Sequence, residues 1–347
     1  MTQIKGPNAF GNVRDFKYIG AMGGVGLLGI GSYLPERVMA NSDWEAYCGA
    51  SADWLVARTG IRERRIAAET ETTVDLAVRA AEAALANGGL ARGELTELIV
   101  ATDTPEVFGP DTAAYVQDRL RLGEIPAYDL AGSGCAGFIL GLALAASRVQ
   151  GEGGKALLVA VELVSRIMDW QDRRVAPLFG DGAGAAIVGE SDRLEILALY
   201  NATDGSGADA LGLEVGGTRA PVTPERVACG EHKRVVLQGE RIFRTAIKRM
   251  VETGEIVLAK AGLRAEDIAL LIPGQANIHL IGAVAKGLGV PLERVAINLD
   301  RYGDTGSAAF PIALEEALDS GRIKPGDHLL MLAFGMGFHW GGAAIRY

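Results

Sequence analysis

The stretch AYDLAGSGCAGFILGLALAASRVQGEGGKALLVA, residues 127–160, contains the pattern that decides the fold. It predicts a short strand, a glycine-rich turn, a long apolar helix and a second strand. Residues 296–333, AINLDRYGDTGSAAFPIALEEALDSGRIKPGDHLLMLA, repeat the same order of elements. A supersecondary unit that recurs in one chain indicates an internal repeat. We therefore predict two related halves.

Two further pairs of segments match between these halves. Residues 85–105, LANGGLARGELTELIVATDTP, correspond to residues 258–277, LAKAGLRAEDIALLIPGQAN. Residues 180–189, GDGAGAAIVG, correspond to residues 335–347, GMGFHWGGAAIRY. Strands that alternate with helices of about 10 to 15 residues indicate a mixed sheet covered by helices on both faces. The sequence therefore predicts a duplicated α/β core.

The helix that follows Cys135 has no polar face. Its sequence, CAGFILGLALAA (135–146), is almost continuously apolar, whereas a surface helix shows only an apolar stripe. We expect this helix to be buried between layers. The fold class is therefore α/β, with duplicated halves in a five-layered α/β/α/β/α arrangement.

The repeats also suggest domain boundaries. We expect an N-terminal extension over residues 1–23, an N-terminal half over 24–195 that carries the nucleophile, and a C-terminal half over 196–347. Between the repeated segments, residues 204–246 begin rich in Gly and Pro. We expect this stretch to form a long loop over the site, followed by a helix.

Composition and charge exclude several function classes. The chain is 49% hydrophobic and 22% charged, and no apolar run reaches the roughly 18 residues of a membrane span. A net charge of -9 argues against nucleic-acid binding. Its 3 cysteines are too few and too scattered for a zinc site or a disulfide framework. We expect a cytoplasmic protein with no membrane or nucleic-acid partner and no metal. The basic run RTGIRERRI (58–66) fits either a solvated face or an anionic ligand site.

Cys135 is the candidate nucleophile. It stands where a glycine-rich turn becomes the apolar helix. A helix start presents unpaired N–H groups and a partial positive charge, and both favour thiolate over thiol. A thiolate at this position can accept an acyl group. Cys48 and Cys229 have no such setting, so we interpret them as structural.

Five motifs occur along the chain in this order: DWLVARTGIRERRIA (53–67), CAGF (135–138), FGDGAGAAIV (179–188), QAN (275–277) and SGRIKPGDHLLMLAFGMGFHWG (320–341). Together they resemble the ketoacyl-[acyl-carrier-protein] synthase III branch of the thiolase superfamily. The resemblance covers about residues 24–347. It implies a thiolase fold, a homodimer and a cysteine acylated by coenzyme A or carrier-protein thioesters. It implies no permanently bound cofactor.

The resemblance also implies positions for the active site. The family uses a cysteine, a histidine and an asparagine, and the matching residues here are Cys135, Gly274 and Asp304. The family's oxyanion donors are the N–H of the cysteine and an N–H of a glycine-rich turn near the C-terminus. That turn is FGMGF here, so the expected second donor is the N–H of Met336. The segment DLAGSGCAG (129–137) is one residue longer before the cysteine than the usual family spacing.

The changes at Gly274 and Asp304 alter the expected chemistry. In the family the histidine and asparagine polarise a malonyl thioester carbonyl, so that loss of carbon dioxide leaves a stabilised enolate. Glycine offers no side-chain donor, and an ionised aspartate only accepts hydrogen bonds. Decarboxylative condensation is therefore disfavoured by both changes. The chain has four histidines to consider as replacements: His232, His279, His328 and His339. His279 and His328 match positions away from the catalytic centre, and His232 lies in the variable loop. His339 follows the oxyanion turn and stays open as a catalytic residue.

Several residues match the family's binding residues for the thioester. Trp54 and Arg58 match a pair near the coenzyme A adenine, and Arg173 is expected as a third member of that clamp. An aromatic face and guanidinium planes suit stacking on a purine and pairing with its phosphates. Asn277 matches a residue that contacts the pantetheine arm, and we count Phe243 among the substrate-binding residues.

Arg244 and His279 match positions that the family uses to dock the carrier protein. An acidic carrier would be attracted to a local basic rim despite the net negative charge of the chain. Phe108 loosely matches a residue that reaches the pocket of the partner subunit.

We therefore expect an acyltransferase of secondary metabolism that resembles the family's members in antibiotic pathways. Cys135 would take an acyl group from a thioester and pass it to an amine or hydroxyl of a small molecule, with Asp304 as a base if burial raises its pKa. Two alternatives stay open. One is a decarboxylative synthase inactivated by an engineered His-to-Gly change at Gly274. The other is a non-catalytic partner subunit that binds thioesters. The sequence does not identify the acyl group or the acceptor.

Overall fold

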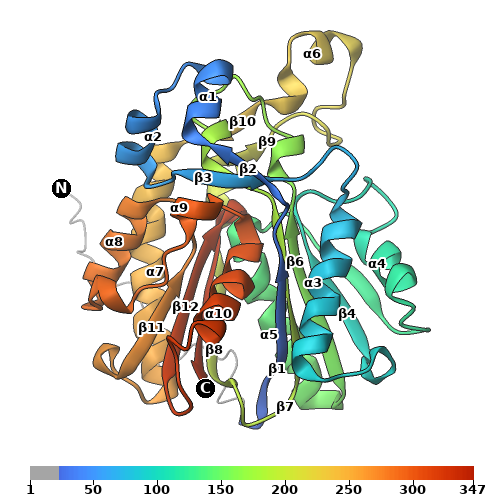
Figure 1. Cartoon of the computed structure of the whole chain (residues 1–347), viewed down its shortest axis with the longest axis vertical. Coiled ribbons are helices and arrows are strands. Elements are labelled where there is room, and N and C mark those ends of the chain that lie inside the picture. The colour runs from blue at the N-terminus through green and yellow to red at the C-terminus, as the bar shows by residue number, and fades with distance from the viewer. Residues whose placement is uncertain (1–22) are drawn as a thin grey trace, which may run out of the picture.

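The computed structural model describes residues 23–347 (Figure 1). The expected N-terminal extension, residues 1–23, lies outside the described residues apart from Gly23. The described fold begins with strand β1 (Val25–Tyr33) and ends with strand β13 (His339–Arg346).

Within residues 23–347, nine strands form one sheet in the order β11-β12-β13-β8-β1-β7-β6-β4-β5. The sheet consists of two half-sheets, because β1 and β8 pair through only Gly26 and Glu195. By contrast, β1 and β7 pair along nearly their whole length. The other strands span Glu97–Ala101 (β4), Ala127–Leu130 (β5), Lys155–Glu162 (β6), Gly182–Glu190 (β7), Glu195–Thr203 (β8), Ile268–Pro273 (β11) and His328–Gly335 (β12).

The two half-sheets have the same internal order. In the N-terminal half, β4 and β6 are parallel neighbours, β6 pairs antiparallel with β7, and β7 pairs with β1. In the C-terminal half, β11 and β12 are parallel, β12 pairs antiparallel with β13, and β13 pairs with β8. An isolated parallel bridge between Leu271 and Val295 occupies the place that β5 has beside β4. The predicted duplication is confirmed.

Helices cover the half-sheets in layers. Helices α5 and α10 pack against strands of both half-sheets, so they form the central layer. Helices α3 and α4 cover the outer face of the N-terminal half, while α7 and α8 cover the outer face of the C-terminal half (Figure 1). This is the expected five-layered arrangement. The six helices span Thr73–Gly88 (α3), Thr112–Leu120 (α4), Gly137–Glu152 (α5), Gly239–Ala261 (α7), Ile278–Leu288 (α8) and Ala309–Asp319 (α10).

The central layer is held by close apolar packing. The rings of Phe138 in α5 and Phe310 in α10 stack with centroids 6.3 Å apart, and both side chains are fully buried. Gly141 lies so near Leu158 of β6 that an added Cβ would stand 2.5 Å from a Leu158 methyl carbon. Among the described helices, the segment Gly134–Glu152 is long and apolar enough to cross a membrane, yet 56% of that window is buried inside the fold. Its central position accounts for its composition.

The segment expected as a long loop contains secondary structure of its own. Strands β9 (Leu211–Leu213) and β10 (Val235–Leu237) pair antiparallel, and the short helix α6 (Pro224–Ala228) lies between them. Helix α7 follows, as expected. A Cβ added at Gly212 would lie 3.8 Å from the sulfur of Met336. The strand pair therefore lies beside the glycine-rich turn near the C-terminus.

A smaller layer connects the halves at one end of the molecule. It contains the antiparallel strands β2 and β3 and three short helices (Figure 1). These elements span Arg37–Ala40 (β2), Glu63–Ile66 (β3), Asn41–Cys48 (α1), Ala52–Thr59 (α2) and Leu299–Tyr302 (α9).

Arg64 in β3 departs from both readings of the basic run. Its side chain is fully buried. It donates to the carbonyls of Met39 and Pro177 and to the side-chain oxygen of Asn41, and its guanidinium lies 5.6 Å from the centroid of the Trp44 ring. Burial lowers the pKa of Arg64 to about 10. Arg64 thus has a structural role, because its hydrogen bonds join β3 to Met39, Asn41 and Pro177. The spacing of charged residues alone did not reveal this role.

Replacing Arg64 with alanine is expected to lower the free energy of unfolding by about 3 kcal/mol, because three buried acceptors would lose their donor at about 1 kcal/mol each. Urea denaturation followed by circular dichroism measures this. Arg62→Ala, at an exposed position of the same basic run, is the matched control. Equal midpoints for the two variants would contradict this structural role of Arg64.

Candidate active site

Cys135 lies in a 3-10 turn, Gly134–Ala136, that leads directly into α5. The turn needs glycine at two positions, because Gly132 and Gly134 have φ values of 77° and 55°. A Cβ at Gly134 would also stand 2.8 Å from the backbone nitrogen of Met336. The turn that carries Cys135 in the N-terminal half is therefore in close contact with a turn of the C-terminal half.

Asp304 meets Cys135 from the C-terminal half. The Cys135 Sγ lies 3.6 Å from Oδ1 and 3.7 Å from Oδ2 of Asp304. Backbone hydrogen bonds fix Asp304 in place: its N–H donates to the Leu178 carbonyl at 2.8 Å, and its own carbonyl accepts from Gly180 at 3.0 Å. The Gly306 N–H donates to Asp304 Oδ1 at 2.9 Å. The structure thus brings two of the expected catalytic residues into contact.

The electrostatics of Cys135 differ from the expectation. Burial raises the pKa of Cys135 well above its ordinary value, and the carboxylates of Asp304, Glu162 and Asp103 raise it further. Burial also raises the pKa of Asp304, against the opposing effect of the Gly306 N–H. The helix start was expected to favour a thiolate, but burial beside three carboxyl groups outweighs it. Cys135 is therefore a thiol that donates to Asp304.

The two expected oxyanion donors lie on adjoining turns. Gly335 and Met336 link β12 to a short turn, Met336–Phe338. A Cβ added at Gly335 would lie 3.0 Å from the backbone nitrogen of Cys135 and 2.9 Å from that of Ala136. The backbone of the C-terminal turn therefore runs within contact distance of the Cys135 amide. This close approach requires glycine at position 335.

Gly274 leaves room at the end of β11. Its N–H donates to the Leu332 carbonyl at 2.9 Å, and an added Cβ would meet only the ring of Phe310, at 4.0 Å. The next residue, Gln275, is 1% exposed and accepts from the N–H groups of Asn298 and Leu299. The motif around Gly274 therefore keeps a structural role although it has no imidazole.

His339 and His279 make contacts with residues other than Cys135 and Asp304. His339 Nδ1 lies 2.7 Å from the Thr203 hydroxyl, and burial lowers the pKa of His339. A Cβ on Gly337 would touch the His339 ring, so this imidazole packs against the turn that carries Met336. His279 is exposed, and its Nε2 lies 3.1 Å from the Ala57 carbonyl.

Several expected binding residues gather where α2 meets the start of α8. Trp54 is 42% exposed, and the guanidinium of Arg173 lies 6.0 Å from the centroid of its ring. Asn277 caps α8 by accepting from the His279 N–H at 2.8 Å, and its amide donates to the Arg58 carbonyl at 3.1 Å. Asn277 therefore connects the start of α8 to α2, the helix that contains Trp54 and Arg58.

Phe243 and Arg244 lie elsewhere, on the first turns of α7. Phe243 is 38% exposed, and Arg244 pairs with Glu240 at 2.6 Å on the surface of the helix. Phe108 is 92% exposed and follows β4. None of the contacts described for residues 23–347 joins these three residues to Trp54 or to Cys135.

Sequence reasoning missed two acidic residues beside the nucleophile, Asp103 and Glu162. Asp103 comes shortly after β4, and Glu162 ends β6. Because β4 and β6 are parallel neighbours, their carboxyl ends meet at one edge of the sheet. The acidic residues at the ends of two apolar strands were a signal for this arrangement. Within the described chain, no group of three or more His, Cys, Asp or Glu residues is arranged to hold a metal ion.

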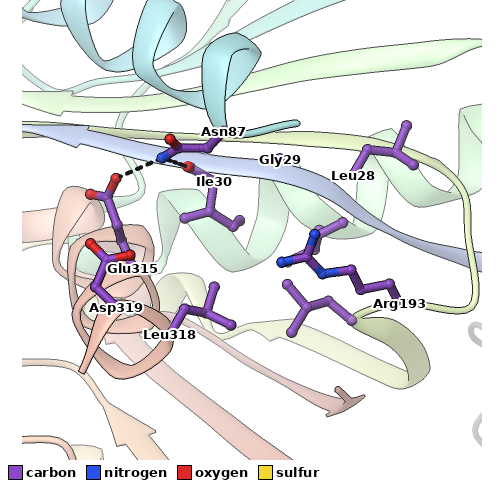
Figure 2. A pocket seen from close by; sticks show the side chains of 10 residues that line it. Leu28, Gly29, Ile30, Asn87, Arg193, Glu315, Leu318 and Asp319 are labelled. Atoms are coloured by element: carbon purple, nitrogen blue, oxygen red, sulfur yellow. Dashed lines mark hydrogen bonds between the residues drawn. The ribbon is translucent and has the colours of Figure 1, made fainter. Parts of the chain in front are cut away.

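A separate cavity of about 220 Å³ lies between β1, α3 and α10 (Figure 2). In its wall, the Asn87 amide donates to the Ile30 carbonyl at 2.8 Å and to Glu315 at 3.2 Å. The cavity reaches Asp319 at the C-terminal end of α10, whereas Asp304 precedes the N-terminal end of that helix. The cavity is therefore distinct from the Cys135 centre.

Comparison with known proteins identifies the family. Residues 128–205 match the family model 3-Oxoacyl-[acyl-carrier-protein (ACP)] synthase III, and residues 258–347 match its C-terminal model. The beta-ketoacyl-[acyl-carrier-protein] synthase III of Symbiobacterium thermophilum is 43% identical over 325 residues, which cover 93% of this chain and 98% of that protein. The corresponding protein of Roseiflexus castenholzii is 42% identical over 92% of this chain and 97% of its own length.

Solved structures agree with this assignment. The synthase III of Thermus thermophilus has 44% identity and a TM-score of 0.85, over 93% of this chain and 99% of that one. The priming beta-ketosynthase of the R1128 polyketide pathway has 32% identity and a TM-score of 0.86, over 96% of this chain and 98% of that one. The chain therefore belongs to the 3-oxoacyl-[acyl-carrier-protein] synthase III family of thiolase-fold enzymes, which condense or transfer acyl groups.

Proposed function

We propose that this family member transfers an acyl group from a carrier-protein or coenzyme A thioester, through Cys135, to an amine or hydroxyl of a small molecule in secondary metabolism. The observation that carries the proposal is the contact of 3.6 Å between Cys135 Sγ and Asp304, together with glycine at position 274. In this proposal Cys135 is the nucleophile and Asp304 is the proton acceptor, while position 274 carries no imidazole.

The proton movements of such a transfer balance within this site. Cys135 Sγ attacks the thioester carbonyl while its proton passes to Asp304. The departing thiol takes that proton, which leaves an acyl-cysteine and an Asp304 carboxylate. The acceptor then attacks the acyl-cysteine, its proton passes to Asp304, and the departing Cys135 sulfur takes this proton back. The N–H groups of Cys135 and Met336 would hold the oxyanion in both halves of the reaction.

Decarboxylative condensation fits this site less well. It needs donors that stabilise a developing enolate, and Gly274 supplies none. Asp304 as a carboxylate would repel the enolate at short range. Two chemical features thus favour transfer to a nitrogen or oxygen nucleophile.

The surface residues support a thioester donor. Trp54, Arg58 and Arg173 are suited to a purine and its phosphates, and Asn277 would stand beside the pantetheine arm. Arg244 and His279 are exposed and would face an acidic carrier protein. In the same proposal the enzyme acts in the cytoplasm as a homodimer, with Phe108 close to the partner subunit.

One observation favours a second candidate, a decarboxylative synthase that has lost its histidine. The space at Gly274, where an added Cβ meets only Phe310 at 4.0 Å, accepts a larger side chain. In this alternative the fold keeps the site of a histidine but not its chemistry.

Incubation with acetyl-CoA is expected to add one acetyl mass to the protein, and the adduct should map to Cys135 by intact and peptide mass spectrometry. Cys135→Ala removes the adduct, because no other described cysteine lies beside the paired turns. Cys229→Ala, at an exposed cysteine, is the matched control and should keep the adduct. If wild-type protein stays unmodified with acetyl-CoA and with acetyl-carrier protein, the acyltransferase proposal is wrong and a non-catalytic thioester-binding subunit is favoured.

Discharge of the isolated acetyl-enzyme to a primary alcohol such as ethanol is expected to depend on the ionisation of Asp304. Because burial raises the pKa of Asp304, its base form is lost at a higher pH than for an ordinary aspartate. The single-turnover rate should fall as the pH drops through this raised pKa and level off above it. Asp304→Asn should lower the rate about a hundredfold or more and abolish the acidic limb. If the rate of this variant still falls at low pH as in the wild type, the base is a group other than Asp304.

The double change Gly274→His with Asp304→Asn is expected to create or raise decarboxylation of malonyl-CoA by about a hundredfold, because it restores two hydrogen-bond donors. Release of carbon dioxide measures the reaction, and Gly274→Ala with Asp304→Asn is the control for the added volume. If the unmodified protein already decarboxylates malonyl-CoA at a comparable rate, our interpretation of both positions is wrong.

A further inference from the structure

Two carboxyl groups behind Cys135 are held together at the ends of neighbouring strands. Both carboxylate oxygens of Glu162 accept from the backbone N–H of Asp103, at 3.2 Å each. Glu162 is 2% exposed. The hydroxyl of Thr104 donates to Glu162 Oε2, also at 3.2 Å. The pair is therefore part of a buried polar network and not a solvated acidic patch.

Asp103 holds the turn that carries the nucleophile. Its Oδ1 accepts from the Gly132 N–H at 2.6 Å. Burial raises the pKa of Asp103, while hydrogen bonds from the backbone N–H groups of Gly132, Gly134 and Ser133 oppose that rise. Successive N–H groups that converge on one anion form a compact cradle. The turn before Cys135 is thus wound around the Asp103 carboxylate.

Glu162 extends the network to the turn that carries Asp304. The Ser307 hydroxyl donates to Glu162 Oε1 at 3.2 Å, and Ser307 lies in the short turn that follows Asp304. A Cβ on Gly306 would stand 2.8 Å from Glu162 Cγ. Glu162 is therefore in contact with both the anchor of the nucleophile turn and the turn of its proton acceptor.

The C-terminal half contains an equivalent contact. Gln275 stands two residues after β11, as Asp103 stands two residues after β4. Its side-chain oxygen accepts from the N–H groups of Asn298 and Leu299, in the segment that leads to Asp304. In both halves, a side chain after one strand thus holds the segment after the next. The recurrence of this hydrogen-bonding contact in both halves indicates that it positions the turns of the site. The residue that makes it is charged only in the N-terminal half, where Asp103 lies near the Cys135 thiol.

We propose that Asp103 and Glu162 are a positioning pair for the reaction. Asp103 holds the turn that carries Cys135, so that Cys135 meets Asp304 and the Met336 turn. Glu162 fixes the turn of Cys135 relative to the turn that follows Asp304. The proposal rests on the proposed role of Cys135 as acyl acceptor. The negative charge of the pair also keeps Cys135 in its thiol form until Asp304 accepts the proton.

The test compares Asp103→Asn with Asp103→Ala. Asparagine keeps an acceptor oxygen for the Gly132 N–H but removes the charge, whereas alanine removes both. The pH midpoint for alkylation of Cys135 by iodoacetamide is expected to fall in both variants, because a neighbouring negative charge is lost. The rate of acetylation by acetyl-CoA should fall at least about tenfold in Asp103→Ala, as expected for a lost hydrogen bond to a charged group. Asp103→Asn should retain more of that rate.

Asp118→Ala, at an exposed position of α4, is the matched control and should match wild type in both measurements. Glu162→Gln keeps an acceptor oxygen and the shape of the side chain but removes the charge. The pH midpoint for alkylation should therefore fall in this variant too. This variant decides the charge effect if Asp103→Ala does not fold. An unchanged midpoint in Asp103→Asn and Glu162→Gln would overturn the proposal. So would acetylation of Asp103→Ala at the wild-type rate. Alkylation needs no acyl donor, so its outcome stands even if the wild-type protein is not acetylated and the proposed function fails.

Discussion

The contact between Cys135 and Asp304 is the interaction on which the site depends. Each residue belongs to a different copy of the duplicated unit, and each stands just before a helix of the central layer, α5 or α10. The two helices pack through the stacked rings of Phe138 and Phe310, whose centroids are 6.3 Å apart. Packing of the central layer therefore contributes to the distance between Cys135 Sγ and the Asp304 carboxylate. A cavity in that layer would alter the geometry of Cys135 and Asp304, because protein interiors are close-packed and transmit strain.

Burial determines the chemistry that this contact can perform. It raises the pKa of Cys135 and of Asp304 together, so a separated thiolate and protonated acid are not the resting state. In the transfer that we propose, the proton lies on sulfur and moves to Asp304 only as the thioester carbonyl is attacked. Once that proton has left with the donor thiol, the Asp304 carboxylate would be close to the incoming acceptor. The same environment disfavours an enolate. That anion would develop beside a carboxylate, and position 274 offers no imidazole to stabilise it.

The sequence allowed the architecture to be predicted because its signals are local. The repeated order of strand, glycine-rich turn and apolar helix predicted two halves, and the missing polar face of residues 135–146 predicted a central helix. Other features depend on contacts between distant segments. Arg64 is buried because β2, α1 and the segment before β7 supply carbonyl and amide partners. The spacing of charges does not contain that information. The ionisation of Cys135 was predicted wrongly because the helix start was visible in the sequence, whereas the neighbouring carboxyl groups come from three separate segments.

The duplication allows equivalent positions of the two halves to be compared, and one such pair differs in charge. Asp103 and Gln275 both stand two residues after a parallel strand, and both accept N–H groups of the segment after the next strand. A neutral amide suffices in the C-terminal half, because its oxygen satisfies two buried N–H groups without adding charge. In the N-terminal half the turn before Cys135 directs several N–H groups at Asp103, and a carboxylate satisfies them better than an amide, which has one acceptor atom. The Asp103 charge also raises the pKa of the adjacent Cys135 thiol. The geometry of this turn and the ionisation of the thiol are therefore linked through one aspartate.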